Sequence, residues 1–394
     1  MLPKLPAELV DLILSFLHPT VLVLGAENQN LIDRATAVTL GRCGLVCRAW
    51  LPSSRRPLFF RVQIVLNNAH RFAQLLKQPH LCTFLPFIRE LVFGEGIAEH
   101  QYWMSTVLPR LIPHFSDTIH VLEYRMYAIG SPKLSLPCPR LGSITHLVIY
   151  NCHETTVADT VRCISGFPAL LHLKLCGSGW HGTALPATAV VPPRLQSLDL
   201  DFRRLEPFLT WIQSEQPPIS DLKLTLPGDR GIFQREPLDS LPQFIQSLGS
   251  SLTSLTLKLG KRWSSDVSKI SNTSFLKSNP NLQTIIFQST YKELITFITG
   301  IHLPGALAHL TLRVYADGGY GDATPWTARE LIEVLNDRLD ERHSTGMTVH
   351  IVRLMRQSST FPLEPPVHVQ GRYRWDGLVT ESTIPDPHYN VPWG

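Results

Sequence analysis

The stretch of the sequence most suggestive of catalysis is rich in glycine. Gly177, Gly179 and Gly182 form the pattern G-x-G-x-x-G directly after an apolar run, and Asp199 and Asp201 follow about twenty residues later, as in a dinucleotide site. Such a site needs a helix whose N-terminus points at the pyrophosphate. That helix cannot form here, because the next residues include prolines at 186, 192 and 193. We therefore predict a turn and no cofactor.

No other segment offers a catalytic or metal-binding arrangement. The glycine-rich segment 317–322 lacks the Lys and the Ser or Thr that a phosphate-binding loop requires. Neither Cys152 with His153 nor Cys176 with His181 completes a four-ligand metal pattern. No serine stands in the pattern G-x-S-x-G. The sequence thus predicts a protein that is not an enzyme and that holds no metal.

Polar residues that alternate with aliphatic ones carry more information. In a strand, alternate side chains point to opposite faces, so these polar residues are expected on one open face of a sheet. Their mixed charge favours a protein or peptide ligand over a polyanion. The alternative for any single residue is a solvated face without a ligand. The candidate substrate-binding residues are His146, Tyr150, His172, Lys174, Asp199, Asp201, Lys223, Lys258 and Arg313, and Asp221, Thr256 and His309 share their pattern.

The strands that would position these residues belong to a recurring pattern. Each copy reads aliphatic, two residues, aliphatic, one residue, aliphatic or aromatic, as in Ile144/Leu147/Ile149. Most steps between copies fall in the range of roughly 20 to 29 residues that is typical of leucine-rich repeats. An ordinary α/β domain explains single matches but not this spacing. The copies begin at Ile88, Ile119, Ile144, Leu170, Leu195, Ile219, Leu252, Leu282 and Leu307.

Helical patterns lie between the strands, which predicts an irregular α/β solenoid over residues 81–355. The register of the step from Ile219 to Leu252 stays open. Met347, Val349 and Ile351 alternate as a last strand, and residues 356–394 are expected to be a Pro-rich tail. The predicted helices are centred on Val157/Val161/Ile164, Phe208/Leu209/Ile212, Leu241/Phe244/Ile245/Leu248, Leu294/Ile295/Ile298 and Leu331/Val334/Leu335/Leu339.

The N-terminal residues 1–62 read as a separate small module of three short helices. Pro6 suits the first turn of a helix, and Leu9 and Ile13 are part of an apolar stripe behind it. Gly44 and Pro52 are expected to break and to end the later helices. So small a segment buries too little surface to be more than marginally stable alone. We therefore expect its apolar surface to contact a partner or the rest of the chain.

The order of residue types here resembles a known family. Leu-Pro-x-Glu-Leu starts at Leu5, and Leu-x-x-Cys-x-Leu-Val-Cys-Arg-x-Trp ends at Trp50. This resembles the F-box family, in the form common in mushroom-forming fungi, over roughly residues 4 to 62, and a linker strand and helix over residues 63–80 look similar to it too. The resemblance implies adaptor-binding residues Leu5, Pro6, Leu9, Ile13, Leu45, Val46 and Trp50, with Cys47 packed inside.

What the resemblance implies is docking on the Skp adaptor of a Skp/cullin/F-box ubiquitin ligase, with the solenoid binding a protein substrate. The alternative is a leucine-rich-repeat scaffold unrelated to ubiquitin, whose N-terminal helices only cap the repeats. Pro6→Ala with Leu9→Ala, and Trp50→Ala, are the variants that separate the two in a co-purification with the adaptor.

Composition limits the partners and the compartment. Lys and Arg number 36 against 32 Asp and Glu, a surplus of 36 − 32 = 4 that is too small to indicate nucleic acid binding. The 7 cysteines are odd in number and have no paired spacing, which favours reduced thiols in the cytoplasm or nucleus. No apolar stretch approaches the ~20 residues of a membrane span, and no signal peptide is expected.

Overall fold

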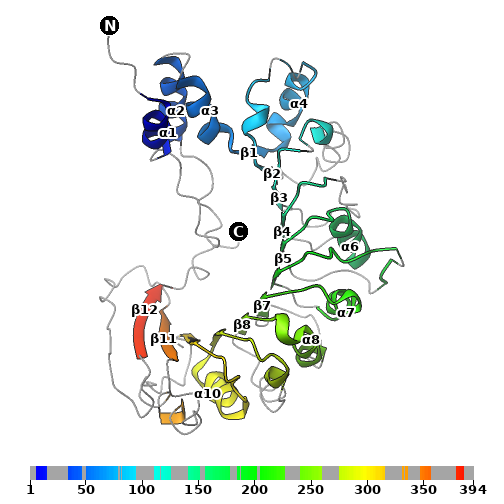
Figure 1. Ribbon diagram of the computed structural model, residues 1–394, viewed down its shortest axis with the longest axis vertical. Coiled ribbons are helices and arrows are strands. Elements are labelled where there is room, and N and C mark those ends of the chain that lie inside the picture. Colours follow the sequence, from blue (N-terminus) through cyan, green and yellow to red (C-terminus); the bar gives the residue numbers. More distant parts are fainter. Residues whose placement is uncertain are drawn as a thin grey trace. The chain divides into compact units, whose positions relative to one another are not determined.

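The computed structural model shows an α/β protein with parallel strands (Figure 1). Contacts divide the chain into two compact units, residues 1–171 with 180–192 and residues 172–179 with 193–394. The residues that the structure describes are 6–15, 34–46, 50–78, 80, 82–94, 111–115, 117–125, 141–150, 156–177, 184–186, 188–201, 205–226, 240–259, 275–315, 331, 333–335, 347–355 and 379–385.

The first unit begins with three helices, α1 (Ala7–Ser15), α2 (Arg34–Val46) and α3 (Trp50–Phe59). The carbonyl of Pro6 accepts hydrogen bonds from the amides of Leu9 and Val10 at 3.1 and 3.2 Å, so the predicted helix start is confirmed. A small core of Val10, Leu14 and Leu40 joins the helices, and Cys43, Trp50 and Leu58 pack against it.

The predicted breaks at Gly44 and Pro52 are wrong. Gly44 lies inside α2, and Pro52 lies in the first turn of α3, where its missing N–H leaves no helical bond unmade. A β-carbon on Gly44 would lie 2.8 Å from the Oγ of Ser54 on α3. Glycine in a helix costs only about 1 kcal/mol, and the close packing of α2 on α3 outweighs that cost.

Among the described residues of the first unit, the sheet has four parallel strands, β1 (Arg61–Ile64), β2 (Glu90–Gly94), β3 (Val121–Arg125) and β4 (His146–Tyr150). Each pairs with the next in chain order. The helical elements that accompany them are α4 (Leu66–Leu75), α6 (Val157–Ser165) and the short 3-10 turns η2 (Leu85–Phe87) and η4 (Ile112–His114). Asn68 of α4 accepts from the Val65 amide at 2.8 Å, as the third residue of the helix in a capping box.

The second unit repeats this plan with strands β5 to β12, again paired in parallel in chain order. This order is the one expected of a solenoid-like repeat. The strands are β5 (His172–Cys176), β6 (Ser197–Asp201), β7 (Asp221–Leu226), β8 (Ser254–Leu259), β9 (Thr284–Ser289), β10 (His309–Tyr315), β11 (Thr348–Met355) and β12 (Val379–Pro385). The helical elements are α7 (Glu206–Glu215), α8 (Ser240–Leu248), α10 (Tyr291–Gly300), η5 (Gly249–Ser251) and η6 (Phe275–Ser278).

Burial confirms the strand positions that the repeat pattern predicts. The three aliphatic or aromatic positions of every predicted copy are at most 6% exposed. Equivalent positions stand opposite each other in the register, as Leu91, Leu122 and Leu147 do. The step left open in the sequence is resolved, because Leu222 pairs with Leu255.

In the second unit, α7, α8 and α10 lie on one side of the strands (Figure 1). They bury apolar residues there, and the rings of Phe287 and Phe297 stack with centroids 3.8 Å apart. The helices predicted from Val157, Phe208, Leu241 and Leu294 are all present. The opposite side of the strands carries no helix among the described residues, and we call it the helix-free face.

Polar side chains tie several repeats to the one before. Ser143 Oγ donates to the Ile119 carbonyl at 2.7 Å, and Ser251 Oγ donates to the Ile219 carbonyl at 3.0 Å. The buried amide of Asn279 donates to the carbonyls of Ile245 and Gly249 at 3.0 and 2.9 Å. These hydrogen bonds satisfy backbone carbonyls that do not take part in strand pairing.

The C-terminal part differs from the prediction in one respect. Leu331 and Leu335 are helical and buried, and Met347, Val349 and Ile351 are buried along β11 as expected. However, β11 is not the last strand, because β12 lies inside the predicted Pro-rich tail and pairs with β11. The sequence of β12, VTESTIP, lacks the apolar alternation on which the strand predictions depended. Leu339, the last member of this predicted helix, lies outside the described residues.

Candidate binding surfaces

Large apolar side chains are exposed on the first two helices. On α1, Val10 and Leu14 face the small core, whereas Leu9 and Ile13 are exposed one position earlier in each turn. This helix is therefore apolar on two sides and covers only one of them with described residues. Leu45 and Val46 at the end of α2 are 85% and 64% exposed. Leu12 and Val38, which are not among the predicted adaptor-binding residues, are exposed too.

Other residues of the predicted adaptor contact have different surroundings. Trp50 is half-buried and packs against the core of Val10, Leu14 and Leu40, so it contributes to folding. Pro6 is exposed just before α1. Leu5 and Cys47 lie outside the described residues. We define the exposed apolar surface as Leu9, Leu12, Ile13, Val38, Leu45 and Val46.

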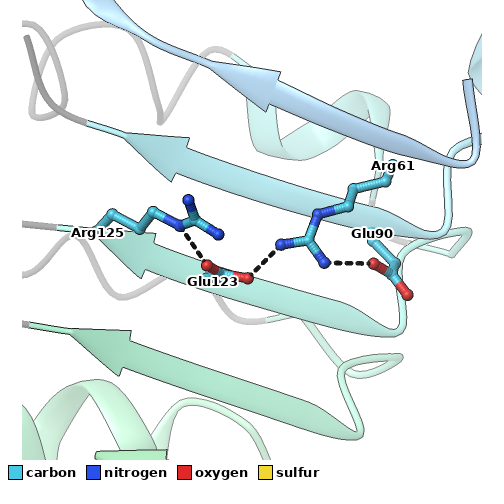
Figure 2. A network of polar contacts seen from close by, with 4 residues as sticks. All are labelled: Arg61, Glu90, Glu123 and Arg125. Atoms are coloured by element: carbon cyan, nitrogen blue, oxygen red, sulfur yellow. Dashed lines mark hydrogen bonds and ion pairs between the residues drawn. The ribbon is translucent and has the colours of Figure 1, made fainter. Parts of the chain in front are cut away.

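In the first unit, the side of the strands opposite to buried Leu91, Phe93 and Leu122 carries a network of four charged residues (Figure 2), and we call it the helix-free face of this unit. Arg61 contacts Glu90 at 3.0 Å and Glu123 at 2.6 Å, and Arg125 contacts the other carboxylate oxygen of Glu123. All four side chains are at most 16% exposed. Two cations and two anions thus neutralise each other across β1, β2 and β3.

Tyr150 extends this network to β4, because the Arg125 guanidinium lies 5.9 Å from the centre of its ring. His146 lies on the same strand and contacts the Thr145 hydroxyl through Nδ1 at 2.9 Å. Tyr150 and His146 were expected on this face from the sequence, but Arg61, Glu90, Glu123 and Arg125 were not. For Glu123 and Arg125, alternation with Leu122 and Tyr124 in β3 was the available signal.

The predicted face residues of the second unit form rows across neighbouring strands. Lys174, Asp199 and Lys223 are in register on β5, β6 and β7, and Lys223 Nζ lies 2.6 Å from Asp199 Oδ2. One row further along, Asp201 of β6 pairs with Thr225, which pairs with Lys258 of β8. The structure therefore brings these polar residues onto one face, as predicted. Ser197 Oγ also donates to Asp221 Oδ2 at 3.1 Å.

Partial burial changes the acidity of several groups on this face. Burial, reinforced by Asp199, raises the pKa of Asp201 to about 6. Burial, with Lys223 and Arg313 nearby, lowers the pKa of Lys258 to about 8. Burial also lowers the pKa of Arg313 and of His172, although Asp221 opposes the shift at His172. The ionisable groups on this face are therefore partly desolvated, and their charged forms have a higher free energy there than in water.

The described residues include neither a metal site nor, at Cys176, an activated thiol. They contain no group of three His, Cys, Asp or Glu side chains that could hold a metal ion. Burial raises the pKa of the Cys176 thiol to about 12, so the thiol is not a nucleophile at neutral pH. Cys43, Cys82, Cys163 and Cys176 are free thiols. Most of the glycine-rich stretch after Gly177 and all of residues 317–322 lie outside the described part of the chain.

Among the described residues, no helix has the length and apolar character needed to cross a bilayer. Comparison with protein-family models gives no match, and comparison with curated proteins gives no significant match. Among solved structures, the chain is distantly similar to a Bacteroides fragilis protein that was a structural genomics target. The identity is 12%, the TM-score is 0.34, and the similarity covers 75% of this chain and 68% of the other. A TM-score this low supports no argument about function.

Proposed function

We propose that this protein is a substrate receptor of a Skp/cullin/F-box ubiquitin ligase. In this proposal α1 to α3 are an F-box module that docks on the Skp adaptor, and through it on a cullin scaffold. The strands that follow are leucine-rich-repeat-like and bind a protein substrate. The free cysteines suit a cytoplasmic or nuclear protein.

The observation that carries the proposal is the exposure of Leu9, Ile13, Leu45 and Val46. The F-box resemblance assigns these residues to the adaptor contact, and each is a large apolar side chain that the described part of the chain leaves exposed. Exposed large apolar side chains on a small helical module are typical of a protein–protein interface. A helical cap that binds no partner has no need for this exposure on α1 and α2.

In the mechanism that follows, this chain carries out no chemical step and acts by bringing the substrate close to the enzyme. The receptor holds a substrate on its helix-free face and the adaptor on its N-terminal helices. A target lysine is then kept at a high effective concentration near the ubiquitin-loaded enzyme. The mixed charges of Lys174, Asp199 and Lys223 suit a peptide better than a uniform polyanion.

The test is co-purification with the Skp adaptor. The variant Leu45→Glu/Val46→Glu changes exposed positions, so we expect the protein to fold normally and to lose the adaptor. The matched control is Leu75→Glu/Val190→Glu, which makes the same change at two other exposed apolar positions and should keep the adaptor. A folded wild-type chain that binds no Skp adaptor removes the ligase function and leaves the repeat scaffold as the function.

A further inference from the structure

Two cations on the helix-free face flank a buried amide on adjacent strands. Lys258 of β8 pairs in register with Gln288 of β9, which pairs with Arg313 of β10. Neighbouring strands lie about 4.8 Å apart, so the two cationic residues are about 10 Å apart at their α-carbons. Gln288 is 3% exposed, and its Nε2 donates to the Tyr315 hydroxyl at 2.6 Å. We call these four residues the cationic cluster.

Within the described residues, neither cation of the cluster has an ion pair or a side-chain hydrogen bond. Asp199 and Asp201 raise the pKa of Lys258, but burial and the positive charges of Lys223 and Arg313 lower it more. Asp199 is itself engaged by Lys223. Holding a partly desolvated charge without a counter-ion costs free energy, and a bound anion would offset that cost.

The first unit provides an internal comparison on the same kind of face. There the buried charges of Arg61, Glu90, Glu123 and Arg125 are paired with one another, with an equal number of cations and anions (Figure 2). The repeats can therefore accommodate a neutral, fully paired charge network on this face. The cationic cluster departs from that arrangement, and such departures from local pairing are typical of binding sites.

We propose that Lys258 and Arg313 bind an anionic side chain of the protein substrate, a carboxylate or a phosphate, with Gln288 and Tyr315 holding the site in shape. Guanidinium and ammonium groups form strong charge-assisted hydrogen bonds with both anions. The ligand is a peptide and not a nucleic acid, because Asp201 and Asp199 two strands away would repel the next phosphates of a polyanion. The assignment rests on the proposed function only in taking the ligand to be a protein.

The binding test uses the full chain and degenerate synthetic peptides whose central residue is fixed as serine, glutamate or phosphoserine. We expect the glutamate set, the phosphoserine set or both to bind about tenfold or more tighter than the serine set. Hydrogen bonds to charged groups are strong enough to give a difference of this size. Preference for phosphoserine alone identifies phosphate as the source of the anion, and equal preference identifies any carboxylate or phosphate. Equal binding of all three sets overturns the proposal.

The variant Lys258→Gln/Arg313→Gln should abolish this preference. The matched control is Lys277→Gln/Lys292→Gln, which removes the same charge at exposed positions on η6 and α10, and it should keep the preference. A preference that survives in the first variant overturns the assignment. So does tight binding of a single-stranded oligonucleotide that displaces the anionic peptides.

A second readout separates a binding site from a structural one. If the two cations serve a ligand, removing them leaves the melting temperature unchanged or higher, because an unpaired desolvated charge is lost. If they are paired within the chain, the melting temperature falls, and the proposal is overturned. Adaptor binding is measured separately with the exposed apolar surface intact, so that loss of the ligase function and loss of this site are distinguishable.

Discussion

Gly44 of α2 lies against Ser54 of α3, so closely that a β-carbon on Gly44 would come within 2.8 Å of the serine Oγ. Ser54 is 2% exposed and donates to the Leu51 carbonyl, and Leu51 lies 3.4 Å from the same β-carbon position. The contact fixes how closely the second and third helices approach. It also explains why a residue with poor helix propensity stands inside a helix.

We expect Gly44→Ala to destabilise the N-terminal helices by about 1–2 kcal/mol, because overpacking outweighs the gain in helix propensity. Gly41 is the matched control, since it lies in the same helix with nothing within 4 Å of its β-carbon position. Gly41→Ala should stabilise by roughly 0.5–1 kcal/mol. Urea denaturation followed by circular dichroism measures both, and equal effects would contradict the close contact.

Trp50 and Leu45 should separate folding from binding. Trp50→Ala removes a ring that packs on the small core, so we expect a loss of about 2–3 kcal/mol, below the full cost of a wholly buried Trp. Leu45→Ala changes an 85% exposed side chain and should stay within about 0.5 kcal/mol. Thermal melting measures the stabilities, and an adaptor pull-down at a temperature where both variants are folded measures binding.

Glu123→Gln should be among the most destabilising substitutions on the helix-free face of the first unit. It leaves Arg61 and Arg125 partly buried without their shared carboxylate, for which we expect a loss of about 3 kcal/mol. Asp159→Asn is the control, because its pair with the 59% exposed Arg162 should contribute about 0.5 kcal/mol or less. Comparable losses in denaturant titrations of the two variants would show that the network adds nothing.

The pKa of Asp201 predicts a pH dependence of stability. The folded state raises this pKa from its usual 3.8 to about 6, so the protonated form is favoured by folding. The stabilisation of the folded state that comes from protonating Asp201 is fully present below about pH 4, and it is lost as the pH rises through about 6. Asp201→Asn should therefore stabilise at pH 7 by roughly 1–2 kcal/mol after allowance for solvent screening, and should change little at pH 4. Thermal melts at the two pH values decide this, and a destabilised variant at pH 7 would contradict it.

Sequence periodicity predicted the strands well because each repeat buries the same three positions. The pattern could be recognised in the triplet beginning at Leu252 as easily as in the triplet beginning at Ile144, although the segments that flank them differ. The rows of polar residues on the helix-free face were also predictable, because polar and apolar residues alternate within those strands. The continuation of α2 through Gly44 was not predictable, because it depends on contact between α2 and α3.

Interactions between repeats were the other part that local patterns could not show. Arg61 and Glu123 are 62 residues apart in sequence and meet only because β1, β2 and β3 stack in register. Asn279 likewise bonds to backbone groups more than one element away. The pairing of β12 with β11 depends on a strand whose sequence lacks an apolar repeat.

The pairing of each strand with its neighbours in chain order also bears on synthesis. Within each unit, a strand emerging from the ribosome finds its preceding partner already made, so the sheet can grow one strand at a time. A chain that stops early would end on an open strand edge with unpaired backbone groups, which invites association with other chains. Premature termination in the repeats should therefore give an aggregating fragment and not a shorter folded protein.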